Sequence, residues 1–148
     1  VAQAEELADR MQGMTLAQQS AFLLDAIGSA ASFLDLEAIK LALSSSFFDA
    51  RATDREYPWQ IHDLGQDPSL FYRDPQGPEI QSAALTLLQC QEFVDCGPNS
   101  PFTWYWCFSR AVCEPGWDLY AYLNHVHSPL EDEQILAILE LLLELRGG

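Results

Sequence analysis

Four cysteines are the residues of this chain whose type and spacing could support chemistry. They form two C-x5-C pairs, Cys90 with Cys96 and Cys107 with Cys113, on either side of the stretch CGPNSP. Such cysteines can remain buried free thiols, form disulfides, or hold zinc or an iron–sulfur cluster. Structural zinc sites place ligands two to four residues apart, so this spacing disfavours metal. We predict no metal or cofactor; free thiols and disulfides both remain open.

The stretch between the pairs predicts a helical hairpin. Gly97 is typical of a residue just beyond a helix, and Ser100 followed by Pro101 is typical of a helix start. We therefore expect one helix to run from 78 to about 95 and the next from 101 to about 112. The two helices should lie antiparallel across this turn.

The predicted hairpin gives two pairings for the cysteines. Residues equidistant from the turn come level, which sets Cys96 beside Cys107 and Cys90 beside Cys113. Six residues rotate a helical side chain by about 600°, so the cysteines of one motif point about 120° apart. One bridge is then more plausible than two. The arrangement resembles stapled helical hairpins of the twin-CxnC type, although those use spacings of three or nine residues.

Capping residues and apolar periodicity predict helices along most of the chain, and no segment alternates as a strand would. The expected helices cover 2–11, 15–34, 35–47, 78–95, 101–112, 117–126 and 130–146, with Asp35 as the cap of the third. The fold class is therefore all-α, a single-domain bundle of six or seven helices over 1–148.

The last predicted helix has the clearest start and an unusual composition. Ser128 and Glu131 form a capping box, and the acidic run through Asp132 and Glu133 suits the helix dipole. Leucine and isoleucine then occur on all sides of the helix. This pattern predicts burial on nearly every side and would allow a homodimer.

Residues 51–78 contain too many prolines and glycines for a helix but carry many apolar side chains. We interpret this segment as a long ordered loop packed on the helices. Loops of this length are often functional. The alternative is an irregular segment that only covers the core.

Charge narrows the classes of partner. With 22 acidic and 7 basic residues, the chain has a formal net charge of −15. This disfavours direct binding to nucleic acid or to an anionic membrane surface. The charge either maintains solubility or steers a basic protein partner. No apolar run reaches the roughly 18 residues of a membrane span.

The sequence says less about the compartment. No signal peptide is recognisable, but the chain begins at Val1, as a trimmed or processed form would. A cytoplasmic location is slightly favoured, and bridged cysteines would instead imply an oxidising compartment.

Aromatic residues concentrate in 102–108 and 117–122, where they form either a core or a wall for a flat ligand. Trp104 and Phe108 recur at core spacing. Tyr105 and Trp106 cannot both face the same side as Trp104, so at least one should be partly exposed.

No catalytic signature occurs, and we lean against an enzyme. The leading hypothesis is a non-catalytic acidic interaction module, such as an inhibitor or immunity protein, an assembly factor or a chaperone-like adaptor, which binds a basic protein. Its predicted contact residues are the following: Trp59, Phe71, Tyr72, Trp106, Glu131, Asp132 and Glu133. Alternatives are a small-molecule or pigment carrier or enzyme with an aromatic pocket, and a redox-responsive disulfide module.

Overall fold

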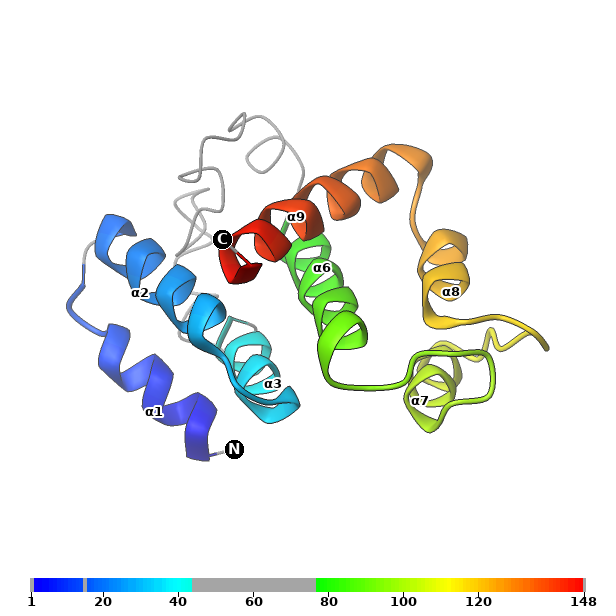
Figure 1. Cartoon of the computed structure of the whole chain (residues 1–148), viewed down its shortest axis with the longest axis horizontal. Coiled ribbons are helices and arrows are strands. Elements are labelled where there is room, and N and C mark those ends of the chain that lie inside the picture. Colours follow the sequence, from blue (N-terminus) through cyan, green and yellow to red (C-terminus); the bar gives the residue numbers. More distant parts are fainter. Residues whose placement is uncertain (1, 15, 44–76, 148) are drawn as a thin grey trace.

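The computed structural model describes residues 2–14, 16–43 and 77–147, and regular structure within these ranges is entirely helical (Figure 1). The helices are α1 (Ala2–Met11), α2 (Leu16–Ser29), α3 (Phe33–Leu43), α6 (Gly77–Glu92), α7 (Pro101–Ser109), α8 (Leu119–Val126) and α9 (Pro129–Gly147). These seven helices confirm the predicted all-α class.

The core lies where α9 packs along α6 and reaches α2 (Figure 1). Buried α9 residues recur at helical spacing, and α6 supplies the facing side chains. They are Ile135, Ile138, Leu139 and Leu142 of α9, with Ile80, Ala84, Leu85 and Leu88 of α6. Burying each large aliphatic side chain contributes about 1.5–3 kcal/mol, so this contact is the main apolar stabilisation of the fold.

The prediction that α9 is buried on nearly every side is wrong. Glu133, Leu136, Glu140, Leu143 and Glu144 are exposed, and their spacing places them on one side of the helix, here called the outer face of α9. Leu136 and Leu143 are 40% and 37% exposed. The three glutamates interrupt the apolar pattern on that side, so the face meets water.

The start of α3 corrects another prediction. The Asp35 backbone N–H donates to Ser32 Oγ at 3.2 Å, so Ser32 is the cap and Asp35 lies inside the first turn. The Asp35 carboxylate accepts from the Ala31 N–H at 2.8 Å and from Gln3 Nε2 of α1 at 3.0 Å. Because α2 ends at Ser29, the predicted extension of that helix to residue 34 is wrong.

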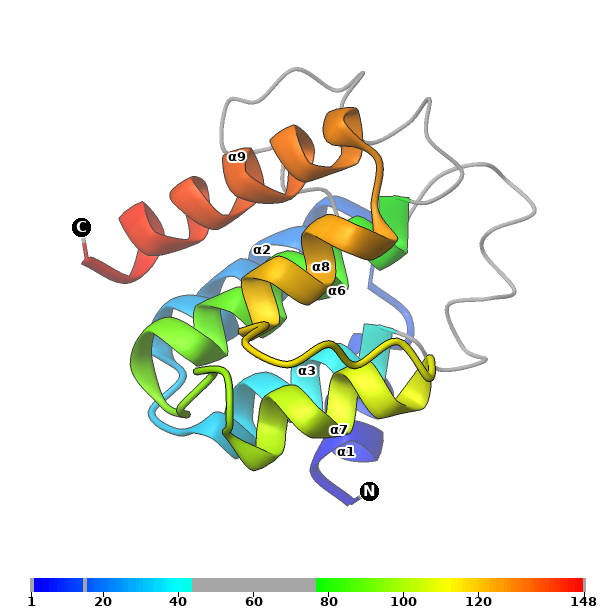
Figure 2. The ribbon, with the colours of Figure 1, turned by 90° about the vertical axis from the view of Figure 1, so that its right-hand side faces the viewer.

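Helices α7 and α8 lie beside each other, and in Figure 2 α7 lies in front of α3 and α8 in front of α6. The ring of Phe102 on α7 meets Phe33 of α3 edge-on, with 5.4 Å between centroids. Phe102 also packs edge-on to Trp106, at 6.3 Å. The α6–α7 hairpin is confirmed, with α3 and α8 supplying the contacts that hold α7.

The predicted helix starts at Ser100 and Ser128 are confirmed. The Thr103 N–H donates to Ser100 Oγ at 3.2 Å. The Ser128 N–H donates to Glu131 Oε1 at 2.8 Å, and the Glu131 N–H returns a bond to Ser128 Oγ at 3.2 Å. In contrast, α8 starts at Leu119, two residues after the predicted start, because Asp118 caps it by accepting the Ala121 N–H at 2.8 Å.

Most of the predicted loop lies outside the described residues; residues 77 and 78 belong to α6. Among the helices that the structure describes, none combines the length and hydropathy that crossing a bilayer requires.

Candidate functional site

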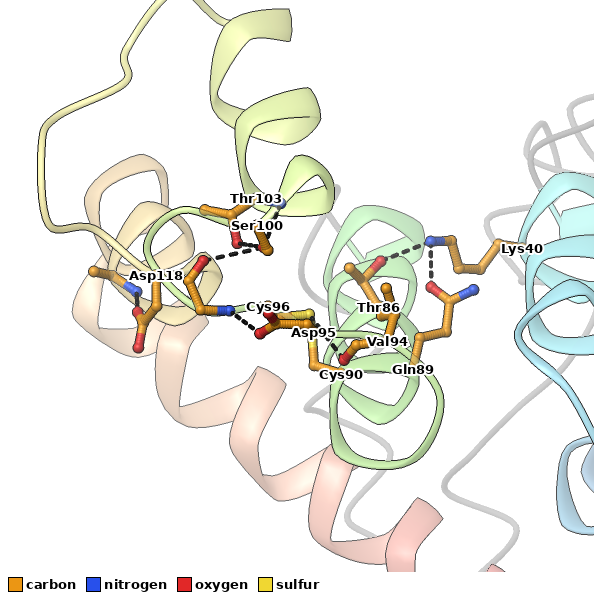
Figure 3. Close-up of a disulfide and its surroundings, with 12 residues drawn as sticks. Lys40, Thr86, Gln89, Cys90, Val94, Asp95, Cys96, Ser100, Thr103 and Asp118 are labelled. Atoms are coloured by element: carbon orange, nitrogen blue, oxygen red, sulfur yellow. Dashed lines mark hydrogen bonds between the residues drawn. A yellow bond between two sulfur atoms is a disulfide. The ribbon is translucent and has the colours of Figure 1, made fainter.

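Each C-x5-C motif forms a disulfide within itself. Cys90 is bonded to Cys96 (Figure 3) and Cys107 to Cys113, with Cα–Cα distances of 5.5 and 4.9 Å. The predicted pairing of Cys96 with Cys107 and of Cys90 with Cys113 is therefore wrong. The alternative of free thiols is excluded as well, since all four cysteines are bridged.

The reason for the local pairing is that both helices end between the two cysteines. Six residues of regular helix rise about 9 Å, beyond the roughly 7 Å that a disulfide can span between Cα atoms. The predicted ends at 95 and 112 are wrong: α6 ends at Glu92 and α7 at Ser109. The chain turns back after each end and returns the second cysteine to the first.

The end of α6 is formed by two main-chain bonds to one carbonyl. The N–H groups of Phe93 and Val94 both donate to the Gln89 C=O, at 2.8 and 3.1 Å. The Val94 bond spans five residues, as in a π-helix, so it widens the last turn, and Asp95 then accepts the Gly97 N–H at 2.8 Å. The loop is thereby held in the bend that Cys96 needs.

The end of α7 is a Schellman motif with an unusual residue. The Val112 N–H donates to the Cys107 C=O at 3.1 Å, and the Ala111 N–H donates to the Phe108 C=O at 3.0 Å. Ala111 has φ +55°, the left-handed region that glycine normally occupies at this position. The motif reverses the chain and places Cys113 beside Cys107.

The first disulfide also fixes where α8 begins. The Cys96 C=O accepts the Leu119 N–H at 3.1 Å, one residue after the Asp118 cap. Figure 3 shows Cys96 between the end of α6 and Asp118. The disulfide loop is therefore a joint between α6 and α8.

A buried lysine lies near this joint (Figure 3). Lys40 is 6% exposed, and its Nζ donates to Thr86 Oγ1 at 2.8 Å and to Gln89 Oε1 at 2.9 Å. The Glu37 carboxylate lies 3.2 Å from Nζ. Burial lowers the pKa of Lys40, an effect that Glu37 partly offsets. This network joins α3 to α6 by polar contacts inside an apolar core.

Trp106 is placed differently from the predicted surface anchor. It is half-buried, its ring centroid lies 5.1 Å from Lys40 Nζ, and its covered indole N–H has no acceptor. Its neighbour Tyr105 is 69% exposed, and Phe108 is 65% exposed. The exposed aromatic surface of α7 therefore consists of Tyr105 and Phe108.

The three acidic residues at the start of α9 differ in their contacts and exposure. Glu131 caps Ser128 and lies 3.7 Å from His127, and the Ser128 N–H holds its pKa below the ordinary value. Asp132 is half-buried, and burial raises its pKa. Only Glu133 is exposed. The three residues do not form one exposed acidic patch.

A groove of about 330 Å³ lies between α6, α8 and α9. The Cys90–Cys96 disulfide, Leu119 and Leu139 line it, and Tyr120 and Leu136 belong to its exposed rim. Leu136 also belongs to the outer face of α9. The groove and that face therefore form one continuous surface.

Three predicted contact residues, Trp59, Phe71 and Tyr72, lie outside the described residues. Sequence reasoning missed Lys40, although a lone lysine within the apolar stretch AIKLAL was a usable sign of a buried network.

The part of the chain that the structure describes contains no group of three or more His, Cys, Asp or Glu side chains arranged to hold a metal ion. Comparison of the chain with protein-family models, curated proteins and solved structures gives no match.

Proposed function

We propose that this chain is a non-catalytic acidic interaction module that binds a basic protein partner. The observation that carries the proposal is the unequal exposure of its charges. Acidic residues outnumber basic ones 22 to 7. Among the described residues, Lys40 is buried and Arg146 is half-buried, whereas most of the acidic side chains are exposed. The outward field is therefore negative, which steers a cationic partner.

Three of the cations have contacts within the fold. Lys40 is buried, Arg10 lies over the Phe22 ring at 5.0 Å, and Arg146 pairs with Glu92. Among the described residues, no basic side chain forms an ion pair with Glu133, Glu140 or Glu144 on the outer face of α9. Their charge is available to a partner.

The groove and the outer face of α9 together offer a suitable docking surface. Leu136 is exposed at the rim, and Glu133 and Glu140 lie about one turn before and after it on the same face. An amphipathic segment could place an apolar side chain in the groove and lysine or arginine beside the glutamates. Such a segment is the occupant that we propose.

The same surface suits a second copy of the chain poorly. Two outer faces brought together would juxtapose carboxylates, and like charges in contact disfavour association. The proposal is therefore a complex with a different, basic protein. The partner would belong to an inhibited enzyme or toxin, or to an assembly that this chain helps to build.

The bridged cysteines favour an oxidising compartment for this function. Disulfides persist in such compartments and are rare where glutathione keeps thiols reduced. The proposed partner is then a secreted, periplasmic or lumenal basic protein.

A labelled amphipathic peptide of leucine and lysine is a direct probe. We expect anisotropy to report binding at about 0.05 M salt that weakens strongly at about 0.5 M salt. Glu133→Gln with Glu140→Gln should weaken low-salt binding about fivefold, at about 0.5 kcal/mol per surface charge. Leu136→Ser should weaken binding at both salt concentrations.

Matched variants elsewhere control for general effects. Glu5→Gln with Glu6→Gln removes the same charge from the exposed side of α1, and Leu34→Ser removes an exposed leucine from α3. Equal losses in these controls would contradict the docking surface. Binding that ignores salt would contradict the acidic module itself.

A further inference from the structure

Helix α7 carries the two most exposed aromatic side chains in the part of the chain that the structure describes. Tyr105 is 69% exposed and Phe108 is 65% exposed, and their spacing of three residues places them on one side of the helix. The half-buried Trp104 packs against Phe108, with 4.9 Å between ring centroids. We call these three rings, together with the exposed Pro101, the α7 face.

The α7 face lies in a part of the fold without charge. Among the described helices, only α7 and α8 contain no Asp, Glu, Lys or Arg, and the two lie beside each other. Figure 1 and Figure 2 both place α8 between α7 and α9, so the α7 face is apart from the outer face of α9. An acidic surface can therefore approach the α7 face without meeting carboxylates of the helix that carries it.

A second copy of the same chain is the occupant that this charge distribution favours. Each copy has a net charge of −15, so two copies repel each other over most of their surfaces and associate best where charge is absent. A basic partner, in contrast, gains no electrostatic attraction from α7 itself. The cores of protein interfaces are depleted of charge and enriched in Tyr, Trp and Phe, as the α7 face is.

The order of residues on the α7 face also suits a two-fold interface. In such an interface, a residue i of one copy meets a residue j of the other, and j meets i. Pro101 and Phe108 are equidistant from the midpoint between Trp104 and Tyr105. When two α7 helices cross antiparallel at that midpoint, Phe108 meets Pro101 of the second copy and Tyr105 meets its Trp104.

The helix that carries this face is fixed at both ends before any association. Ser100 caps its start, and the Cys107–Cys113 disulfide and the Schellman motif hold its end. Association therefore orders little backbone. An aromatic side chain buries about 150–250 Å², so the exposed rings supply less than the roughly 800 Å² per partner of a standard interface. The expected complex is weak and reversible.

We propose that two copies of this chain associate through the α7 face, with Tyr105 beside the two-fold axis. Salt screens the repulsion between two acidic chains, so it strengthens this dimer. The same salt weakens the binding of a basic partner to the outer face of α9. The two proposals therefore predict opposite effects of salt, and each can fail without the other.

Sedimentation equilibrium of the full chain, with its disulfides intact, is the test. We expect dimers at protein concentrations of about 0.1–1 mM, as for a small interface. The association constant should rise about tenfold between about 0.05 M and about 0.5 M sodium chloride. A dimer that weakens with salt would overturn the proposal. A monomer under all these conditions would also overturn it and would leave the α7 face to a different partner.

Matched variants locate the contact. Tyr105→Asp places two like charges beside the axis and should abolish the dimer, whereas Tyr105→Phe should keep it. Phe108→Ser should weaken the dimer by removing an exposed ring. Tyr120→Asp is the control, because it makes the same change of charge at an exposed tyrosine on α8. Equal losses in Tyr105→Asp and Tyr120→Asp, or a dimer that survives both Tyr105→Asp and Phe108→Ser, would overturn the proposal.

Discussion

The guanidinium of Arg146 and the carboxylate of Glu92 form a bidentate pair that fastens the end of α9 to the end of α6. Nε donates to Glu92 Oε2, and Nη2 donates to Oε1 at 2.9 Å. Nη1 also donates to the Ile27 C=O of α2 at 2.8 Å. One side chain thus joins three helix ends.

This geometry predicts that Arg146→Lys is not conservative. A lysine cannot make two parallel bonds and also reach the Ile27 carbonyl. We expect Arg146→Lys to lower the free energy of unfolding by about 1–2 kcal/mol in urea melts. The control is Arg10→Lys, which makes the same change at an exposed arginine on α1. An equal loss of unfolding free energy in Arg10→Lys and Arg146→Lys would contradict a special role for the bidentate Arg146–Glu92 pair.

The capping box of α9 predicts a dependence of stability on acid. The lowered pKa of Glu131 means that its ionised form is favoured in the folded protein. Its contribution is therefore present above the ordinary pKa of 4.5 and is lost as pH falls through the lowered value. Glu131→Gln should flatten that part of the pH–stability curve relative to the native chain. Ser128→Ala should cost about 1 kcal/mol at neutral pH. A Glu131→Gln curve parallel to the native one would contradict the assignment.

Lys40 predicts an effect at the alkaline end. Because its folded pKa is below its ordinary 10.5, the unfolded chain binds more protons between the two values. Stability from this group therefore rises as pH rises through that window. Lys40→Met should remove this rise, and at neutral pH should cost about 1–3 kcal/mol by leaving Thr86 and Gln89 without their donor. The difference between native and variant melts at each pH isolates the effect, and a constant difference would argue against a shifted lysine.

The disulfides predict a specific peptide map and a modest loss on removal. Digestion under non-reducing conditions should yield the linked pairs 90–96 and 107–113. Each closes a short loop, so converting one pair to serine should cost about 2 kcal/mol. Because Cys107 is buried and carries the Schellman carbonyl, the 107–113 variant should also loosen α7, seen as faster amide exchange at Ala111 and Val112. A 96–107 linkage would contradict the structure.

The sequence predicted helix starts better than helix ends. The helix starts at Ser100 and Ser128 could be predicted because a cap is a hydrogen bond between residues close in sequence. The ends at Glu92 and Ser109 arise from main-chain bonds and disulfide closure. Ala111 occupies a left-handed conformation, and without a glycine at that position the sequence did not indicate the turn. The predicted disulfide pairing was wrong because it took the helices to be regular through 95 and 112.

The candidate site was harder to predict for a related reason. Trp106 and Tyr105 are adjacent, and only contacts from α3 and α8 determine which of them is enclosed. Lys40 likewise becomes a buried group only once α6 brings Thr86 and Gln89 to it. Exposed charge, in contrast, follows largely from composition, so the acidic character of the chain was evident before its fold.

The two local bridges also affect how the chain would mature. Four cysteines can pair in three ways, and the native way closes the two shortest loops, each with a sequence separation of 6. The entropy of loop closure favours short loops, so an extended, newly made chain would form the native pairs before the others. Oxidation of this protein should therefore proceed with little reshuffling and without help from a disulfide isomerase.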